Sequence, residues 1–127
     1  LNFLEGKWET HNGIEVEFRY TKGRIALIGE VTSPIGPNAV IMWGWDAGKC
    51  APIFTWFDAE GTYVRQEYLI MEKNRKSGLV YRSGADGAET GNVVVQRFGP
   101  DRYKVTVNTA KPDGSVTKAS TALIRKE

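Results

Sequence analysis

Four consecutive residues with polar atoms, Arg65 to Tyr68, stand inside a segment that otherwise has the composition of a β-strand. Side chains alternate between the two faces of a strand, so Arg65 and Glu67 share one face while Gln66 and Tyr68 share the other. Burying an unpaired charge costs several kcal/mol. We therefore expect Arg65 and Glu67 on the outer surface as a surface pair. An inward pair that serves as catalytic acid and base is the alternative.

The opposite face of this segment carries neutral hydrogen-bonding groups. If its phase continues into the following strands, Gln66 and Tyr68 are joined by Tyr81 and Gln96. A few directional polar groups among apolar walls are typical of a pocket for a small molecule. The alternative is a solid core in which buried tyrosine hydroxyls bond locally.

Three tryptophans, Trp43, Trp45 and Trp56, stand in two neighbouring apolar runs. Their period-two spacing directs them to a common face if the two runs pair as a hairpin, and the sequence leaves open whether that face is inside or outside. With that face inside, the expected contact area for a ligand comes from Trp43, Trp45, Phe54, Trp56 and Tyr68, and its orientation from Gln66, Tyr81 and Gln96.

The same two runs, residues 41–45 and 53–57, are apolar on both of their faces. A monomer would expose one of those faces to water, and contiguous exposed apolar surface marks an interaction site. The pattern therefore predicts a homodimer that covers the outer face of these strands.

Other groups capable of chemistry stand in weaker contexts. The single histidine, His11, is beside an Asn-Gly turn, and no nucleophile motif accompanies it, so it supports neither a catalytic triad nor a His-rich metal site. Cys50 is alone, so it makes no internal disulfide. The glycine-rich residues 83–91 lack the lysine of a phosphate-binding loop, and a flexible rim loop is expected there. We expect no metal and no cofactor.

Composition points to one globular domain over residues 1–127. The chain has 41% hydrophobic residues, 25% charged residues and a formal net charge of +2. The weak charge and the absence of a long basic run argue against a nucleic-acid partner. No apolar stretch reaches the roughly 18 residues of a membrane span, and residues 1–7 lack a signal pattern. We expect a cytoplasmic protein, while a leader removed earlier stays open.

The elements that position these residues are short strands. Runs rich in Val, Ile, Thr and aromatics recur about every 12 residues between Gly, Asn, Asp or Pro, which is typical of an all-β meander. Pairs such as Asn12-Gly13 and Asp113-Gly114 suit tight hairpin turns. The expected strands are Lys7 to His11, Ile14 to Tyr20, Arg24 to Thr32, Ala39 to Asp46, Ala51 to Phe57, Thr62 to Met71, Gly78 to Ser83, Asn92 to Phe98, Arg102 to Thr109 and Val116 to Arg125.

Ten consecutive antiparallel strands would leave long unpaired edges in an open sheet. Closure removes those edges, so we predict a ten-stranded antiparallel up-and-down barrel, with a two-sheet sandwich as the alternative. A barrel of ten strands encloses more space than side chains alone usually fill. The first and last strands become neighbours on closure, which places Trp8 beside Arg125 at one end of the barrel.

Gly6-Lys7-Trp8 at the entry to the first strand resembles the Gly-x-Trp motif that opens lipocalins and other members of the calycin superfamily. That resemblance implies a calycin-like barrel in which a basic residue of the last strand, here Arg125, stacks on the tryptophan. A longer pattern resembles bacterial lipocalin-like domains of unknown function, the DUF1579 type: Leu4-x-Gly6-x-Trp8-Glu9, Gly44-Trp45-Asp46, Phe54-Thr55-Trp56-Phe57-Asp58 and Pro112-Asp113-Gly114.

Some calycin subfamilies fit less well. Fatty-acid-binding proteins insert a helix pair between their first two strands, whereas His11, Asn12 and Gly13 turn directly into the next strand here. Nitrobindin-like haem proteins use a histidine from a late strand, and this chain has none after His11. Classical secreted lipocalins usually carry disulfides, which the lone Cys50 does not allow.

Three functions follow as hypotheses. The first is binding of a small hydrophobic or aromatic molecule inside the barrel. The second is a cofactor-free cyclase or isomerase that acts on a hydrophobic metabolite in the same cavity, using a tyrosine or the pair Arg65 and Glu67. The third is a dimeric interaction module without a small ligand.

Overall fold

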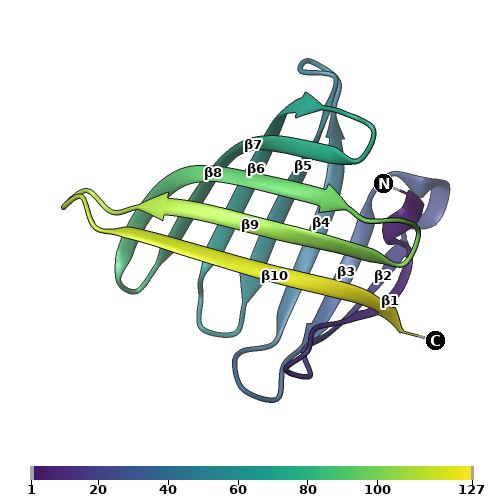
Figure 1. The fold of residues 1–127 in the computed structure, drawn as a ribbon, viewed down its shortest axis with the longest axis horizontal. Coiled ribbons are helices and arrows are strands. Elements are labelled where there is room, and N and C mark those ends of the chain that lie inside the picture. The colour runs from purple at the N-terminus through teal and green to yellow at the C-terminus, as the bar shows by residue number, and fades with distance from the viewer. Residues whose placement is uncertain (1, 127) are drawn as a thin grey trace.

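The computed structural model describes residues 2–126, in which ten antiparallel strands form one closed sheet (Figure 1). Each strand pairs with its sequence neighbours, and β1 pairs with β10. The predicted up-and-down barrel is confirmed. In chain order the elements are η1 (Asn2–Leu4), β1 (Gly6–Glu9), β2 (Glu15–Tyr20), η2 (Lys22–Arg24), β3 (Leu27–Thr32), β4 (Ala39–Asp46), β5 (Ala51–Asp58), β6 (Tyr63–Met71), β7 (Arg75–Gly84), β8 (Gly87–Arg97), β9 (Arg102–Ala110) and β10 (Val116–Lys126).

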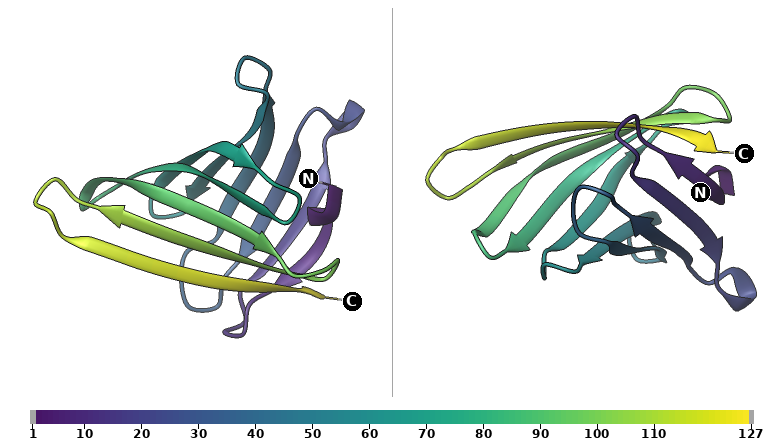
Figure 2. Two further views of the ribbon diagram at one scale, coloured as in Figure 1. Left: turned by 45° about the horizontal axis from the view of Figure 1, so that its top comes forward. Right: turned by 90° about the horizontal axis from the view of Figure 1, so that it is seen from below.

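The strands differ in length, and this shapes the barrel. β1 has four residues, whereas β8 and β10 have 11 each. Figure 2 shows the β9–β10 hairpin reaching well beyond its neighbours to one side. The first part of β10 is correspondingly exposed, and Leu123 near its end is buried. The core therefore lies toward the end of the barrel where the chain begins.

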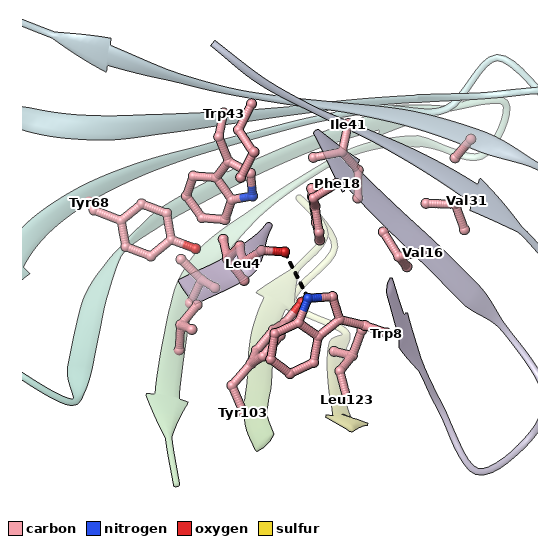
Figure 3. Close-up of a cluster of buried hydrophobic side chains, with 14 of the residues drawn as sticks. Leu4, Trp8, Val16, Phe18, Val31, Ile41, Trp43, Tyr68, Tyr103 and Leu123 are labelled. Carbon is pink, nitrogen blue, oxygen red and sulfur yellow. Dashed lines mark hydrogen bonds between the residues drawn. The ribbon is translucent and has the colours of Figure 1, made fainter. Parts of the chain in front are cut away.

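Alternation of apolar and polar residues decides which face points inward. In β2, Val16 and Phe18 are buried while Glu15, Glu17 and Arg19 are exposed. The buried cluster extends around the barrel, and Figure 3 shows most of its members converging on the interior. It comprises Leu4, Trp8, Val16, Phe18, Leu27, Val31, Ala39, Ile41, Trp43, Tyr68, Val80, Val93, Val95, Tyr103 and Leu123.

The pairing of Trp8 with Arg125 is confirmed at the junction of β1 and β10. The two residues are directly opposite in the strand register, and the guanidinium carbon lies 4.3 Å from the centroid of the indole ring. Arg125 also donates hydrogen bonds to the carbonyl oxygens of Glu5 at 2.7 Å and Phe3 at 2.5 Å. Gly6 makes this possible, because a Cβ at that position would lie 2.8 Å from the Arg125 Nη1 atom.

The prediction of a flexible rim loop over residues 83–91 is wrong. β7 runs to Gly84 and β8 starts at Gly87, so only Ala85 and Asp86 form the turn. Gly87 follows the turn with a φ of +107°, whereas Gly91 allows close packing of strands, because a Cβ there would lie 1.7 Å from the carbonyl oxygen of Asn108 in β9. The sequence alone does not distinguish a glycine that lets two strands approach closely from a glycine in a loop.

The outer face of β4 and β5 is apolar, as the two-sided pattern indicates. Val40 is 49% exposed, Met42 48% and Phe57 60%. Phe57 lies opposite Val40 in the register and packs on the ring of Tyr63, with ring centroids 5.1 Å apart. The homodimer that would cover this face stays a prediction. Among residues 2–126, no helix has the length and apolar character to cross a membrane.

Candidate functional site

The barrel contains a cavity of about 780 Å³. This volume is within the usual range for small-molecule sites, about 300–1,000 Å³. The cavity begins at η1, where Phe3 and Leu4 line it, and extends to hairpin loops at the opposite end of the barrel. Pro37, Glu60 and Asp86 line it there, one from each of three loops.

One end of the barrel, which we call the plugged end, is filled by Phe3, Leu4, Trp8, Tyr103 and Arg125. The Trp8 side chain is completely buried, and its Nε1 donates a hydrogen bond to the carbonyl oxygen of Leu4 at 2.7 Å (Figure 3). Its indole meets the ring of Tyr103 edge to face at 4.8 Å. This packing ties η1 across the barrel end.

The opposite end, which we call the mouth, is formed by the loops that carry Pro37, Glu60, Asp86 and Lys111. The helical turns η1 and η2 both connect to the plugged end, and no helix of the described chain covers the mouth. The cavity therefore reaches the loops of the mouth without a helix over them.

Three aromatic rings form a wall of the cavity, which we call the aromatic wall: Trp43, Phe54 and Tyr68. The ring of Trp43 meets that of Phe54 at 5.0 Å and that of Tyr68 at 5.4 Å. The Tyr68 hydroxyl donates a hydrogen bond to Gln66 Oε1 at 2.6 Å. Burial, with a smaller effect from Tyr103, raises the pKa of Tyr68 well above its ordinary value, so this phenol stays neutral. Apolar rings with one satisfied polar pair suit an apolar or aromatic ligand.

Five of the residues predicted to contact a ligand line the cavity together: Trp43, Phe54, Trp56, Gln66 and Tyr68. The strand register explains their convergence. Trp43 is opposite Phe54, and Phe54 is opposite Gln66, so these side chains share the inner face of β4, β5 and β6.

The inward placement expected for the other three residues is wrong. Trp45 continues the inward phase of β4, but it stands opposite Pro52 beyond the core and is 63% exposed. Tyr81 points outward, because its neighbour Val80 is the residue that pairs with inward Gln66. Gln96 is exposed. It follows Val95, which takes the inward position of β8.

Arg65 and Glu67 are on the outer face, as expected from the cost of burying charge, but the expected pairing of the two is wrong, because Glu67 pairs with Lys49 instead. Glu67 Oε1 pairs with Lys49 Nζ at 3.0 Å. The Arg65 guanidinium carbon lies 5.8 Å from the ring centroid of Tyr81, which is also outside. An inward acid and base built from this pair is therefore wrong.

The structure instead brings a different ion pair into the cavity wall. Glu89 is 6% exposed, and its Oε2 accepts a hydrogen bond from Arg82 Nη1 at 3.0 Å. Thr109 Oγ1 donates to Glu89 Oε1 at 3.3 Å. Sequence reasoning missed Glu89 because it assigned this segment to a loop. Extending the alternation of Val93 and Val95 backward through Gly91 would have placed Glu89 inside.

A second carboxylate, Asp58, lies in the cavity wall near the mouth. Its Oδ2 accepts a hydrogen bond from Trp56 Nε1 at 3.1 Å, and its Oδ1 accepts from the backbone N–H groups of Glu60 at 3.0 Å and Thr62 at 3.1 Å. Burial favours the neutral acid, but these three hydrogen bonds and the charge of Arg82 outweigh it and lower the pKa of Asp58. Asp58 is therefore ionised at neutral pH.

His11 and Cys50 take no part in this site. His11 is exposed in the β1–β2 turn, and Cys50 is exposed in the β4–β5 turn at the other end of the barrel. Within residues 2–126, the His, Cys, Asp and Glu side chains form no group of three or more that could hold a metal ion.

A scan against protein-family models finds no match to this chain, and a search of curated proteins finds none either. The all-β barrel class rests on the strand pairing itself. The calycin resemblance of Gly6-Lys7-Trp8 stays a prediction about ancestry, while the barrel-end packing that it implied for Trp8 and Arg125 is present.

Proposed function

We propose that this protein binds a small hydrophobic or aromatic molecule inside its barrel. The observation that carries the proposal is a cavity of about 780 Å³ whose wall contains the packed rings of Trp43, Phe54 and Tyr68. Fixed rings offer contact area without a large entropy cost on binding. Burying roughly 200 Å² of apolar ligand surface contributes about 5 kcal/mol before the costs of association.

Binding is favoured over catalysis by the state of the two tyrosines that line the cavity, Tyr68 and Tyr103, because burial raises the pKa of both. A cyclase or isomerase without a cofactor needs a group that exchanges protons with its substrate. The proton of Tyr68 is already donated to Gln66, and the raised pKa of Tyr68 makes its phenolate inaccessible at neutral pH. Both tyrosines are therefore better suited to forming a wall than to acid–base chemistry.

Ligand titration of matched tryptophan variants tests this proposal. We expect a member of a panel of fatty acids, retinoids, steroids and flavonoids to change tryptophan emission saturably, at one site per chain. Replacing cavity-lining Trp56 by Ala should weaken that binding, whereas Trp45→Ala, at an exposed position, should not. A panel that leaves emission unchanged, or equal losses in both variants, would contradict the proposal.

We further propose that two copies associate through the outer face of β4 and β5. The exposed side chains of Val40, Met42 and Phe57 support this, because water contact with contiguous apolar surface is unfavourable. Light scattering at micromolar concentration should then give about twice the chain mass of 14.1 kDa, and Phe57→Ser should reduce it to the chain mass. A chain mass for the unaltered protein would contradict association.

A further inference from the structure

The cavity is amphipathic along its length. Near the mouth its wall carries a group of polar side chains, which we call the polar belt: Asp58, Thr62, Arg82, Glu89 and Thr109. They come from the ends of β5, β7, β8 and β9 and from the residue before β6, all beside mouth loops. The aromatic wall lies deeper. A ligand that fills this cavity therefore presents an apolar body to the rings and one polar end to the belt.

Most acceptor atoms of the polar belt are already used. Both oxygens of Glu89 accept hydrogen bonds, from Arg82 and from Thr109, and its side chain is 7% exposed. Both oxygens of Asp58 accept hydrogen bonds as well, from Trp56 and from two backbone N–H groups. These carboxylates are poorly placed to accept further bonds from a ligand, but their charges remain.

Arg82 is the belt residue with donors to spare. Its guanidinium has five N–H donors, and within residues 2–126 one hydrogen bond is made, from Nη1 to Glu89. Its side chain is 36% exposed. The charge of Arg82 also lowers the pKa of Asp58, so this guanidinium interacts with both carboxylates of the belt, Asp58 and Glu89. The belt thus offers hydrogen-bond donors beside two carboxylates, and the mouth loops around it add the carboxylates of Glu60 and Asp86 and the ammonium of Lys111.

We propose that Arg82 donates a hydrogen bond to an uncharged oxygen of the ligand, a hydroxyl or a carbonyl, and that Asp58 and Glu89 exclude ligands with a carboxylate at that end. The inference rests on the proposed binding function and specifies its ligand class: a ring-bearing neutral amphiphile rather than a fatty acid. A neutral acceptor gains the bond from Arg82 without repulsion. An anion is repelled by two carboxylates, one of which belongs to the buried side chain of Glu89.

Lys76 offers an anion a competing position and must be tested. It lines the cavity at the plugged end, where its Nζ lies 5.6 Å from the ring centroid of Phe3. Burial, helped by the charge of Arg97, lowers the pKa of Lys76. An acid bound there would have to enter with its charged end first, past the polar belt and the aromatic wall. We therefore expect Lys76 to contribute little to selection among ligands.

Three pyrene probes with a common ring and different ends test the inference: pyrenemethanol, pyrenecarboxylate and pyrenemethylamine. Affinities are measured by probe fluorescence at neutral pH and low salt. We expect the alcohol to bind about tenfold more tightly than the carboxylate, which is the effect of roughly 1.4 kcal/mol. Asp58 and Glu89 attract the charged amine, but Arg82 repels it and its ammonium group has no lone pair to accept the bond from Arg82, so the amine should bind no more tightly than the alcohol.

Charge-neutral variants locate the selection. Glu89→Gln keeps a hydrogen-bonding side chain and should reduce the preference for alcohol over carboxylate severalfold. Asp58→Asn should do the same and serves as the second variant if Glu89→Gln folds poorly. Glu67→Gln is the matched control, because it removes the same charge from the outer face and should leave the preference unchanged.

The outcomes separate this inference from the proposed function. If no pyrene probe binds, the binding function fails and the inference fails with it. If the probes bind but the carboxylate or the amine binds most tightly, or if Glu67→Gln changes the preference as much as Glu89→Gln, the binding function stands and the inference is overturned. Loss of carboxylate binding in Lys76→Met alone would also overturn it, because the acid would then bind at the plugged end.

Discussion

The two ends of this barrel are built from opposite kinds of interaction. At the plugged end, Trp8 is fully buried against Tyr103 and donates a hydrogen bond to the Leu4 carbonyl oxygen of η1. At the mouth, the wall holds the ion pair of Arg82 with Glu89 and no helix of the described chain covers the opening. We infer that the plugged end stabilises the fold, and we propose that the mouth selects ligands. Substitutions at the plugged end should change folding, and those at the mouth should change binding.

The largest expected effect is at the plugged end. Trp8→Ala removes a completely buried indole together with its hydrogen bond to Leu4, and should lower the free energy of unfolding by about 3–5 kcal/mol. Denaturant unfolding followed by circular dichroism measures this. The control is Trp45→Ala at an exposed position, which should stay within about 0.5 kcal/mol of the unaltered protein. Equal losses of unfolding free energy in the two variants would contradict a special stabilising role for the plugged end.

A smaller loss is expected for the partner of Trp8. Arg125→Ala removes the cation from the indole face and hydrogen bonds to Phe3 and Glu5, and should cost about 1–2 kcal/mol while the fold persists. Ligand affinity should be unchanged, because Arg125 does not line the cavity. Unaltered stability would mean that closure of β1 on β10 does not depend on this contact.

The mouth should respond in the reverse way. Replacing Arg82 and Glu89 together by Gln removes both charges and keeps hydrogen-bonding groups, so stability should change by less than about 1 kcal/mol. Affinity for pyrenemethanol should nevertheless fall, because a glutamine side chain is shorter than that of Arg82 and has two N–H donors in place of five. A stability loss as large as that of Trp8→Ala would show that the mouth also holds the barrel together.

The smallest effect concerns acid pH. Burial alone would raise the folded-state pKa of Asp58, but the hydrogen bonds from Trp56, Thr62 and Glu60 lower it below the ordinary value. The resulting stabilisation is complete above the ordinary carboxyl pKa of about 4 and is lost as pH falls through the lowered folded-state value. Stability curves between neutral and acid pH should be flatter in Asp58→Asn. If Asp58→Asn loses as much stability at acid pH as the unaltered protein does, the hydrogen bonds at the mouth do not stabilise the Asp58 carboxylate.

The fold was largely predictable from the sequence, because strand alternation and tight turns are local patterns. Val16 and Phe18 against Glu15 and Glu17 identify a half-buried strand without knowledge of its neighbours. The pairing of the first and last strands follows from closure of the sheet, because an open sheet would leave the backbone groups of both edge strands unpaired.

The site was predictable only in part, because the inward phase of one strand does not carry to the next without the register. Gln66 and Tyr68 were placed correctly from the cost of burying Arg65 and Glu67. Tyr81 was misplaced because the inward partner of Gln66 is Val80.

The polar belt was missed for a different reason. The glycine-rich sequence around Gly91 indicates a loop, yet this glycine lies in β8 and packs closely on Asn108. Consequently Glu89, which shares the inward face with Val93, was assigned to a rim loop and its pairing with Arg82 was not anticipated.

The central claim, that the barrel interior binds a small apolar molecule, is tested most directly by the indole N–H signals in a two-dimensional NMR spectrum. Trp43 and Trp56 line the cavity, Trp45 is exposed outside it, and Trp8 is packed in the plug. On titration with pyrenemethanol, we predict saturable shifts of the Trp43 and Trp56 signals and an unmoved Trp45 signal. A shift confined to Trp45, or no saturable shift of Trp43 and Trp56, would contradict binding in the cavity.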